Sequence, residues 1–391
     1  MDFAFTAEDQ DFRNEVRGFI REHWGLGDTV GGIAAESPED FARGREFARR
    51  LNDRGWFTLA WPKEYGGLGA SHIRQLIFNE ECAYHGAPTG GGSVGFVGPA
   101  IMVHGSEEQK RRFLPPIAHA EVSWCEGFSE PGSGSDLASL QTRAVADGDD
   151  YVINGQKIWT SGAHHADWII LLTRTDPEAP KHRGISCFLV DMKSPGISVQ
   201  PIMQMHNRPG FNQTFFDNVR VPRSHMLGEE NRGWYVAATT LDFERSGVGR
   251  FASGQRNLDE LTEFCRGTSI GGIRVIERPG VREKLAELQI EHAVGRCLAY
   301  RVAWMQGAGK IPNYEASVSK MFGTELAQRL ARAGVNIMGL YGMLFEGSKW
   351  ATLEAKMQTL YLSSLSFTIG AGTSEIQRNI IATRGLGLPR G

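Results

Sequence analysis

The chain has 391 residues, of which 41% are hydrophobic and 22% are charged, and its 42 basic and 45 acidic residues give a formal net charge of −3. This length exceeds what one small core needs, so we expect two or three packed units. The balanced charge, with no long basic run, gives no electrostatic support for a nucleic-acid partner.

The sequence shows no recognisable targeting or anchoring segment. The opening residues, MDFAFTAEDQDF, are acidic, whereas a secretory signal needs a basic start followed by an apolar stretch. The most apolar short run, 168–172, is far too short to span a bilayer. The five cysteines are scattered and lack metal-type spacing. We therefore expect a cytoplasmic protein with reduced thiols and no membrane span.

The first part of the chain has a helical pattern. Thr6 and Asp9 occupy the two positions of a capping box, and Ser106 with Gln109 repeats this arrangement. Apolar residues after each cap recur at helical spacing. We predict an N-terminal α-helical domain over residues 1–121.

The pattern then changes to short β-type runs. Asp147-Gly148 and Asn154-Gly155 are dipeptides typical of hairpin turns. The runs rich in β-branched, aromatic and aliphatic residues are 151–153, 168–172, 185–190, 197–202, 215–216 and 219–221. Because the links between them are short, the strands should pair mostly antiparallel. We predict a middle β domain over residues 122–229.

Helical patterning returns after this domain and lasts almost to the end. The predicted helical runs are 281–305, 314–338 and 356–383, and a glycine-containing connector over 266–280 precedes them. We predict a C-terminal α-helical bundle over residues 230–391. Alternating βα units are absent, so the fold class is α+β and not a doubly wound sheet.

The stretch 124–136, WCEGFSEPGSGSD, is the densest motif of the chain. It can be a loop that presents backbone N–H groups and hydroxyls to a flat polar cofactor or a thioester arm. It can equally be an ordinary turn-rich loop that enters a strand, and local composition alone favours this second interpretation.

Three ordered segments give the sequence a family resemblance: FSEPGSGSD, NGQKIWTSGAHHADWIILLTRT and GAGTSEIQRNIIATRGLGLP. Together they resemble the signature segments of the acyl-CoA dehydrogenase family, and the likeness covers essentially the whole chain. It implies a helix–β–helix fold, with FAD between the β domain and the C-terminal bundle and completed by a second subunit. It also implies dehydrogenation of an acyl-CoA thioester to the trans-2-enoyl-CoA, in fatty acid metabolism or lipid degradation.

The resemblance also implies roles for particular residues. The implied flavin contacts are Phe128, Ser129, Trp159, Thr160, Ser161, Gly339, Gly342, Thr373 and Glu375. The implied substrate contacts are Ser135, Asp242 and Arg245. Without the resemblance, a lone Trp159 would more often be a core residue and Arg245 a cation on a helix surface.

The implied reaction needs a base for the α proton, and a carboxylate in a dry pocket suits this step. Many family members carry that glutamate just before the Gly-Thr of the last motif, where this chain has Ala371. Isovaleryl-CoA dehydrogenase and its relatives place the base on the first long helix after the β domain. There this chain reads LDFERSG, so the resemblance assigns the base to Glu244. The alternative is a surface salt-bridge residue.

Ala371 keeps an implied backbone role. In the family, a main-chain N–H at this position and a ribityl hydroxyl of FAD hold the thioester oxygen, as in an oxyanion hole. The smaller side chain also leaves room near the substrate, which points weakly to a branched or bulky acyl group.

One family feature is missing. The Arg-x-x-Phe-Gly segment that binds the FAD diphosphate across a subunit boundary is replaced by RGTSIGGIRVIERPG, in which Arg274 and Arg278 are candidate substitutes. The sequence therefore leaves open a homotetramer or a heterotetramer with only part of the FAD sites filled. It also leaves open whether electrons pass to an electron-transfer flavoprotein or, as in an acyl-CoA oxidase, to oxygen, and whether the chain is a non-catalytic partner subunit.

Three further features point to no additional chemistry. The glycines 90–92 lack the Lys-Ser/Thr of a phosphate-binding loop, so we predict an ordinary loop. His164 and His165 lack an acidic or cysteine partner at metal-type spacing, so no metal is expected. Cys125 has no histidine placed by the sequence to activate it as a nucleophile.

Overall fold

A computed structural model describes residues 5–27, 38–245 and 247–389, and the side chains of 38 and of 241–245 lie outside this description. The chain divides into two compact units, each with its own hydrophobic core. The first unit comprises residues 1–32, 70–88 and 245–391, and the second comprises 33–69 and 89–244.

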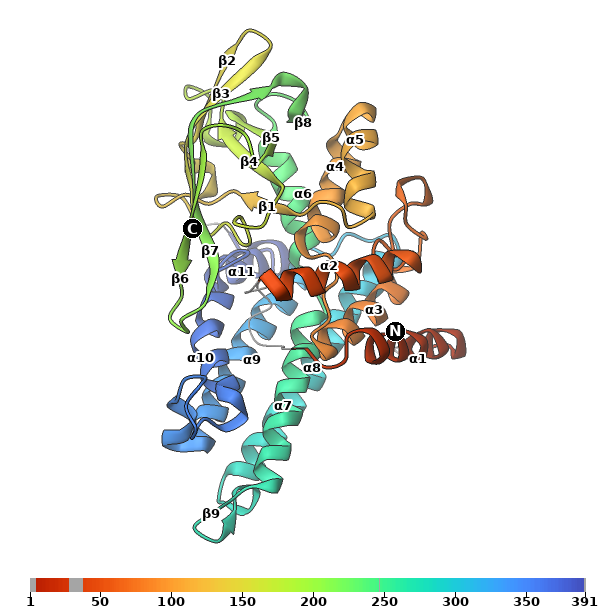
Figure 1. Cartoon of the computed structure of the whole chain (residues 1–391), viewed down its shortest axis with the longest axis vertical. Helices are drawn as coiled ribbons and strands as arrows, with labels where there is room; N and C mark the ends of the chain where they lie inside the picture. The colour runs from red at the N-terminus through yellow and green to blue at the C-terminus, as the bar shows by residue number, and fades with distance from the viewer. Residues whose placement is uncertain (1–4, 28–37, 246, 390–391) are drawn as a thin grey trace. The chain divides into compact units, whose positions relative to one another are not determined.

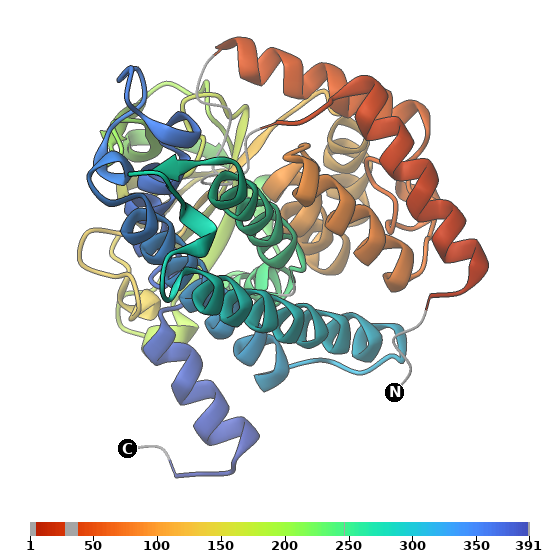
Figure 2. The same cartoon turned by 90° about the horizontal axis from the view of Figure 1, so that it is seen from below.

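The first unit is built mainly from helices, several of which run side by side (Figures 1 and 2). They are α1 (Ala7–His23), α3 (His72–His85), α7 (Gly249–Gly267), α8 (Val281–Gly307), α9 (Tyr314–Met338), α10 (Lys356–Phe367) and α11 (Ser374–Ile380). A hairpin of β9 (Ser269–Ile270) and β10 (Ile273–Arg274) joins α7 to α8, and the short helical turns are η6 (Val275–Glu277), η7 (Gly339–Met343), η8 (Thr352–Ala355) and η9 (Ile381–Gly385).

Local sequence explains where these helices begin and how closely they pack. The capping box predicted for α1 is present, because the Asp9 N–H donates to Thr6 Oγ1 at 3.1 Å and the Thr6 N–H donates to Asp9 Oδ2 at 3.3 Å. Helices α7 and α8 approach so closely that a Cβ at Gly295 would lie 2.2 Å from the Phe251 ring. Glycine at 295 therefore permits this crossing.

The second unit combines a β-sheet with helices. The helices are α2 (Pro38–Asp53), α4 (Gly98–His104), α5 (Glu107–Ala118) and α6 (Gly233–Arg245), with short turns η1 (Lys63–Tyr65), η2 (Ser93–Val97), η3 (Leu137–Ser139), η4 (Lys181–Arg183) and η5 (Arg223–His225). The strands are β1 (Trp124–Gly127), β2 (Arg143–Asp147), β3 (Asp150–Lys157), β4 (Trp168–Arg174), β5 (Ile185–Asp191), β6 (Ile197–Met203), β7 (Pro209–Pro222) and β8 (Met226–Leu227). The predicted helical, β and helical order is confirmed.

The sheet has the strand order β6-β7-β3-β2-β4-β5-β8, and β1 pairs with β4 (Figure 1). The β1–β4 pair and the single β2–β4 contact are parallel, and the remaining described pairs of this sheet are antiparallel. The predicted mostly antiparallel pairing is thus confirmed.

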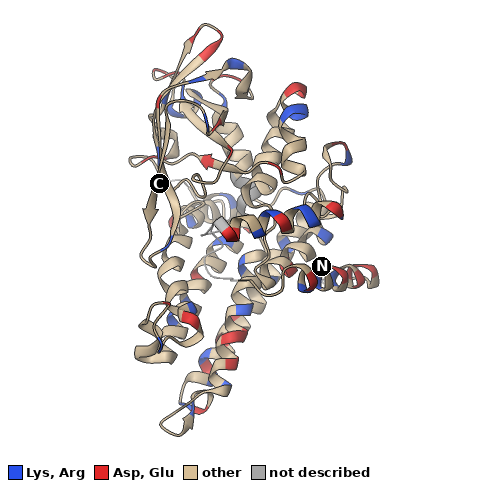
Figure 3. Ribbon diagram, viewed as in Figure 1, with Lys and Arg blue, Asp and Glu red and all other residues tan. Residues whose placement is uncertain are grey.

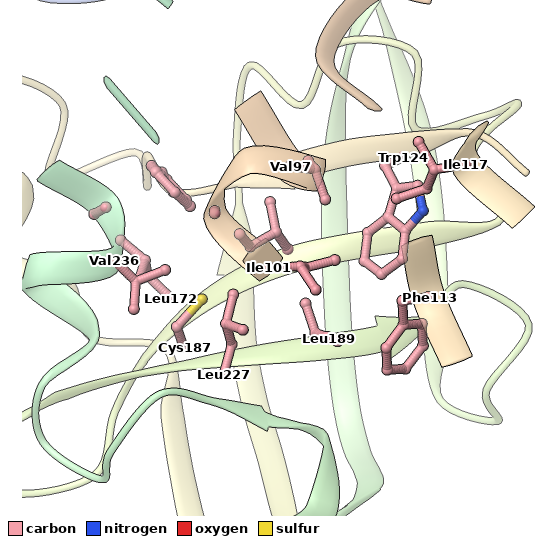
Figure 4. Close-up of a cluster of buried hydrophobic side chains, with 14 of the residues drawn as sticks. Val97, Ile101, Phe113, Ile117, Trp124, Leu172, Cys187, Leu189, Leu227 and Val236 are labelled. Carbon is pink, nitrogen blue, oxygen red and sulfur yellow. The ribbon is translucent and has the colours of Figure 1, made fainter. Parts of the chain in front are cut away.

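Strand β4 explains why 168–172 is a continuous apolar run. Ile170 and Leu172 belong to the cluster in Figure 4, which includes side chains from α4, α5 and α6. Ile169 and Leu171 belong to a second cluster with β3, β5 and β7. Because successive side chains point to opposite faces, a strand buried on both faces needs apolar residues at every position.

One of the two predicted hairpin turns differs from the structure. The Asp147-Gly148 hairpin turn is confirmed, since Asp147 pairs with Asp150. Asn154-Gly155 instead lies inside β3, where the register with β7 shifts. Gly155 has φ +146°, and a Cβ there would lie 2.7 Å from the Thr142 Cα, so the glycine serves a bulge and a close strand approach.

Other boundaries also differ. The predicted runs 215–216 and 219–221 are parts of the one long strand β7. The predicted helical run 356–383 is two helices, because residues 368–373 leave the helix between α10 and α11. Within the predicted loop 90–92, Gly90 and Gly91 have left-handed φ values of +79° and +52°, whereas Gly92 has helical dihedrals and directly precedes η2. A Cβ at Gly92 would lie 2.4 Å from the Phe96 ring.

The charged residues are spread over both units. Figure 3 shows basic and acidic residues interspersed along the helices of both units. None of the helices in the described segments combines the length and the apolar character that a bilayer span requires.

Candidate active site

A buried ion pair anchors the loop that follows β1. The Lys157 ammonium is fully buried and lies 2.8 Å from Glu130 Oε1, and it also donates to the Phe128 carbonyl at 3.0 Å. The Glu130 carboxylate accepts the backbone N–H groups of Gln141 at 2.6 Å and Thr142 at 2.8 Å. One buried pair therefore ties the FSEPGSGSD loop to β3 and to the start of β2.

Burial and charge act against each other in this pair. Burial opposes ionisation of Glu130, but the nearby Lys157 charge and the hydrogen bonds from Thr142 and Gln141 outweigh it and lower the Glu130 pKa. Burial lowers the pKa of Lys157 to about 8 despite the attraction of Glu130. Both groups are charged at neutral pH, so the contact is an ion pair.

This anchor sets Ser129 beside the segment 158–160. The Ile158 N–H donates to the Ser129 carbonyl at 2.9 Å. The next residue, Trp159, has φ +61°, and 54% of its surface is exposed. Its ring meets only the edge of Phe211, at a centroid distance of 5.8 Å, so a large aromatic face stays uncovered within this unit. A bulky residue in the left-handed region is a strained feature of the kind found at functional sites.

Buried polar atoms without partners occur on the segment that follows Trp159 and on the loop that carries Ser129. The Thr160 N–H donates to the Asn212 carbonyl at 3.0 Å, and the Asn212 amide donates back to the Thr160 carbonyl at 2.9 Å. Thr160 Oγ1, Asn212 Oδ1 and Ser133 Oγ are buried without a hydrogen-bond partner in the described part of the chain. Buried polar atoms are normally paired, so these three atoms can serve a bound polar group.

The remaining predicted contacts of this unit lie in exposed positions. Ser135 is exposed in the loop, next to Asp136, which is bound by Lys181 at 2.8 Å. Ser161 is exposed directly after Thr160. The structure thus brings Phe128, Ser129, Trp159, Thr160 and Ser161 into one local platform and puts Ser135 on the same loop as Ser129.

The predicted residues of the last motif lie in the first unit. Ala371 has φ +54°, and Gly372 has φ +84°. The buried Lys320 ammonium holds this loop by donating to the Gly372 carbonyl at 2.8 Å and the Phe367 carbonyl at 3.1 Å. The Gln377 amide donates to the Ala371 and Gly372 carbonyls, at 3.1 Å each. Two buried side chains therefore fix a loop that the backbone alone would disfavour.

The N–H of Ala371 is available in this arrangement. Within the described residues, it donates to no backbone or side-chain acceptor. Thr373 caps α11 by accepting the Ile376 N–H at 3.2 Å. The backbone N–H of Glu375 and then the Thr373 hydroxyl lower the pKa of the exposed Glu375 carboxyl.

The predicted glycine pair ends α9. Gly339 has φ +61°, and a Cβ at Gly342 would lie 2.8 Å from the Val335 carbonyl oxygen, so both positions favour glycine. The side chains that follow are unusually exposed for their type: Leu340 is 82% exposed and Trp350 is 60% exposed. Exposed apolar groups of this size are typical of an interaction surface.

The predicted base, Glu244, has a side chain that lies outside the described residues. Helix α6 runs to Arg245, so residues 242, 244 and 245 lie in its last turn, but the side chains of Asp242, Glu244 and Arg245 lie outside the described residues. A second helix, α7, begins at Gly249, so the helical region after the β domain is interrupted there. The role of Glu244 stays a prediction.

The two candidate substitutes for the missing arginine are both engaged locally. Arg274, on β10, forms an ion pair with Glu277. Arg278 donates to the Ile270 carbonyl at 3.5 Å across the β9–β10 hairpin. Neither side chain is presented without a partner to a phosphate.

Sequence reasoning missed four residues that hold the two loops. They are Glu130, Lys157, Lys320 and Gln377. A usable signal existed for Lys157, because counting by two from Tyr151 and Ile153 puts it on the buried face of β3. A charged residue at a buried strand position calls for a partner.

The other motifs stay apart from these loops. Cys125 is fully buried, and burial raises the pKa of its thiol, which disfavours a nucleophilic thiolate. His165 stacks on Phe41 at a centroid distance of 4.8 Å. Among the described residues, no three His, Cys, Asp or Glu side chains gather in a way that could hold a metal ion.

Lys320→Met tests the anchoring of the last loop. We expect a loss of about 1.5–3 kcal/mol of unfolding free energy, because two carbonyls lose a charged donor in a buried place. Thermal unfolding measures the change. Lys284→Met, which removes an exposed lysine paired with Glu287, is the control and should change stability by less than about 1 kcal/mol. Equal effects of the two variants would contradict the anchoring role.

Comparison with known proteins identifies the family to which the chain is similar. Three family models match successive parts of the chain: "Acyl-CoA dehydrogenase, N-terminal domain" over 6–121, "Acyl-CoA dehydrogenase, middle domain" over 125–219 and "Acyl-CoA dehydrogenase, C-terminal domain" over 231–386. The chain is 37% identical to acyl-CoA dehydrogenase FadE26 of Mycobacterium tuberculosis, over 100% of this chain and 99% of that protein. It is also 37% identical to acyl-CoA dehydrogenase IpdE1 of the same organism, over 97% of this chain and 98% of that protein.

Two solved structures are similar to the chain over its full length. A structure described as the Tcur3481-Tcur3483 steroid ACAD matches with a TM-score of 0.90 and 36% identity, covering 100% of both chains. The ChsE4-ChsE5 complex from Mycobacterium tuberculosis matches with a TM-score of 0.88 and 37% identity, again over 100% of both chains.

Proposed function

The chain belongs to the acyl-CoA dehydrogenase family, and from this premise we propose that it uses FAD to convert an acyl-CoA thioester into its trans-2-enoyl-CoA, with Glu244 as the base. The observation that carries the proposal is the platform of Ser129, Trp159 and Thr160. It offers an uncovered aromatic face beside a hydroxyl on an anchored loop, with unpartnered buried polar atoms nearby. Such a surface suits a flat ring with polar edges.

The residues fit a flavin in both units. Phe128, Ser129, Trp159, Thr160 and Ser161 would hold it in the second unit. Gly339, Gly342, Thr373 and Glu375 would hold it in the first. When bound, FAD would supply the acceptor for the hydride that leaves the β carbon.

Two groups of this chain would act on the thioester. Glu244 would take the proton from the α carbon, and the two electrons of that C–H bond would form the new double bond. The Ala371 N–H would donate to the thioester oxygen and stabilise the negative charge that develops there. Its fixed position, held through Gln377, means that little reorganisation is needed when charge develops. Ser135, Asp242 and Arg245 would contact the substrate.

We further propose a bulky, steroid-like acyl group. The support is the full-length similarity to a structure described as a steroid ACAD, together with alanine at 371, where many family members have glutamate. A smaller side chain at this position leaves volume beside the substrate.

We also propose that the chain works in a heteromeric tetramer. Because Arg274 is paired with Glu277, we propose that another chain supplies the phosphate contact. The exposed apolar side chains of Leu340 and Trp350 offer an interface, and two solved relatives are described as pairs of different chains. The expected electron acceptor is an electron-transfer flavoprotein.

One assay tests the function and the substrate class together. The purified protein, with any co-purifying subunit, is mixed without oxygen with acyl-CoA esters that range from short branched to steroid-like chains. Bleaching of the flavin absorbance should be fastest with the steroid-like esters. If none of the esters bleaches the flavin in FAD-containing protein, the proposed function is wrong; if only short chains do so, the proposed substrate class is wrong.

Two further measurements separate the alternatives. Hydrogen peroxide at a rate equal to substrate turnover in air would favour the oxidase alternative over an electron-transfer flavoprotein. A ratio of FAD to chain near one for the chain purified alone would contradict a heteromer that fills only part of its flavin sites.

A further inference from the structure

A cavity lies in the first unit, in the part formed by α1, α3, α7 and α8. Its volume is about 390 Å³, within the usual range for small-molecule sites. It contains none of the residues assigned above to flavin or substrate. Its polar lining includes Arg13, Arg17 and Arg21 of α1, Glu80 and Glu81 of α3, Gln255 of α7, and Gln289, His292 and Arg296 of α8.

The arginines of α1 form one stripe. Arg13, Arg17 and Arg21 follow one another at four-residue spacing, so they share a face of the helix. Like charges at this spacing repel and destabilise the helix. The arrangement therefore needs negative charge in front of it.

The two glutamates meet only part of that need. Glu81 accepts from Arg13 at 2.7 Å and from Arg17 at 2.9 Å through Oε1, and from Arg17 Nε at 2.9 Å through Oε2. Glu80 pairs with Arg13 at 2.7 Å and with Arg296 at 3.3 Å, and it accepts the Tyr300 hydroxyl at 2.8–2.9 Å. Each of the four carboxylate oxygens is thus already in use.

Donors remain in excess after these contacts. The lining holds four arginines against two glutamates. Arg21 is exposed and has no hydrogen-bond or ion-pair partner among the described residues. Gln255 and Gln289, which also line the cavity, bond to each other at 2.9 Å. Gln255 and Tyr84 donate to Asp259 at 2.8 and 2.9 Å, so this neighbouring carboxylate is also engaged.

His292 provides a second, independent sign of a ligand. It is only 3% exposed and lines the cavity. Neither ring nitrogen forms a hydrogen bond of good geometry in the described residues, although the nearby Phe251 backbone partly opposes the effect of burial on the His292 pKa. Burial lowers the pKa of His292 to about 4, so the ring is neutral at neutral pH and carries one N–H donor. A buried donor without a partner destabilises the folded protein, and a ligand oxygen that accepted from it would offset this cost.

We propose that this cavity binds a small oxyanion, the phosphate or carboxylate group of a metabolite, between Arg21, Arg296 and His292. Guanidinium groups match the geometry of such oxygens and form short, charge-assisted hydrogen bonds with them. Because four helices of one unit supply the lining, a bound anion would link α1 and α3 to α7 and α8. The inference is independent of the dehydrogenase chemistry proposed above.

Calorimetric titration of the FAD-loaded protein with inorganic phosphate, and separately with succinate, tests the site at constant ionic strength. We expect saturable binding of at least one of them, and the two arms distinguish phosphate from carboxylate. Arg21→Gln should weaken the affinity for the anion about tenfold, which is the effect of losing one charged hydrogen bond. Ala293→Glu, on the exposed face of the same cavity, should abolish it by placing a carboxylate among the arginines.

The matched control is Arg282→Gln, an exposed arginine of α8 that does not line the cavity. The Arg282→Gln protein should bind the anion with the same affinity as the unchanged protein. Phosphate can also bind where FAD or CoA phosphates bind, but that binding would be unaffected by the Arg21 and Ala293 substitutions. Binding that is absent, unsaturable or equal in all four proteins would overturn the proposal and leave the arginine–glutamate network a purely structural one.

Discussion

Glu244→Gln should slow anaerobic reduction of the flavin by a matched acyl-CoA about 10²–10⁴-fold, the usual contribution of a positioned general base. The amide keeps the shape of the side chain but cannot accept the α proton. Stopped-flow absorbance of the flavin measures the rate. The flavin content of the purified variant should be unchanged, because the implied FAD contacts lie elsewhere.

Glu229→Gln is the control for this substitution. Glu229 is an exposed glutamate shortly before α6, 3.8 Å from Arg232, and its loss should leave the rate unchanged. A normal bleaching rate in Glu244→Gln would show that another group takes the proton. A slow rate accompanied by flavin loss would indicate a damaged cofactor site and not a missing base.

Adding Ala371→Glu to Glu244→Gln makes the test sharper. By family resemblance, a carboxylate at 371 reaches the same α carbon from a different element. The backbone at 371 already holds a non-glycine residue at φ +54°, so glutamate would meet no new backbone cost there. We expect partial recovery of flavin reduction for a short acyl chain and less for a bulky one, because the new side chain fills space beside the substrate.

The sequence predicted the order of elements well, and the reasons are local. Capping boxes at Thr6 and Ser106 identify helix starts because cap and helix are neighbours in sequence. The run 168–172 identifies β4 because burial on both faces needs continuous apolar residues. Helix α9 matches its predicted bounds because its apolar residues recur at helical spacing without a break.

The failures arise where a residue acts through a distant neighbour. Gly155 resembles a turn glycine, but its role comes from the backbone of Thr142, just before the adjacent strand β2. The predicted helix 356–383 is interrupted because Lys320 and Gln377 hold the carbonyls of a non-helical loop. In both cases a deciding contact, of Gly155 with Thr142 and of Lys320 with Gly372, joins residues more than ten positions apart in the chain, so periodicity cannot show it.

The platform residues show the same limit within the site. Family resemblance identifies Ser129 and Trp159, but it does not say why the loop holds them in place. The answer is the Glu130–Lys157 pair, whose members are separated by 27 residues. A motif therefore predicts which side chains take part, whereas the three-dimensional structure shows what positions them.

Glu130→Gln should destabilise the second unit by about 3–5 kcal/mol, because it leaves the Lys157 ammonium buried without its counter-charge. The measurement is chemical denaturation followed by circular dichroism. Lys181→Met is the matched control, since Lys181 lies 2.8 Å from Asp136, the same distance as in the buried pair, but both side chains are about 60% exposed. It should cost less than about 1 kcal/mol.

The pH dependence separates a charge effect from a packing defect. The folded-state pKa of Lys157, about 8, lies below its ordinary value of 10.5, so the unfolded chain binds more protons between these values. Stability in this window therefore rises with pH for this group. Without Glu130 the folded-state pKa falls further, and the deficit of Glu130→Gln should shrink as the pH is raised toward 10. A deficit independent of pH would indicate lost packing.

The double variant Glu130→Gln/Lys157→Met completes the cycle. Removing both charges eliminates the unpaired ammonium, while the amide oxygen introduced at position 130 can still accept a backbone N–H from Gln141 or Thr142. We expect the double variant to be more stable than Glu130→Gln alone, with an interaction energy of about 1–3 kcal/mol. Strict additivity of the two substitutions would mean that the pair does not hold the loop.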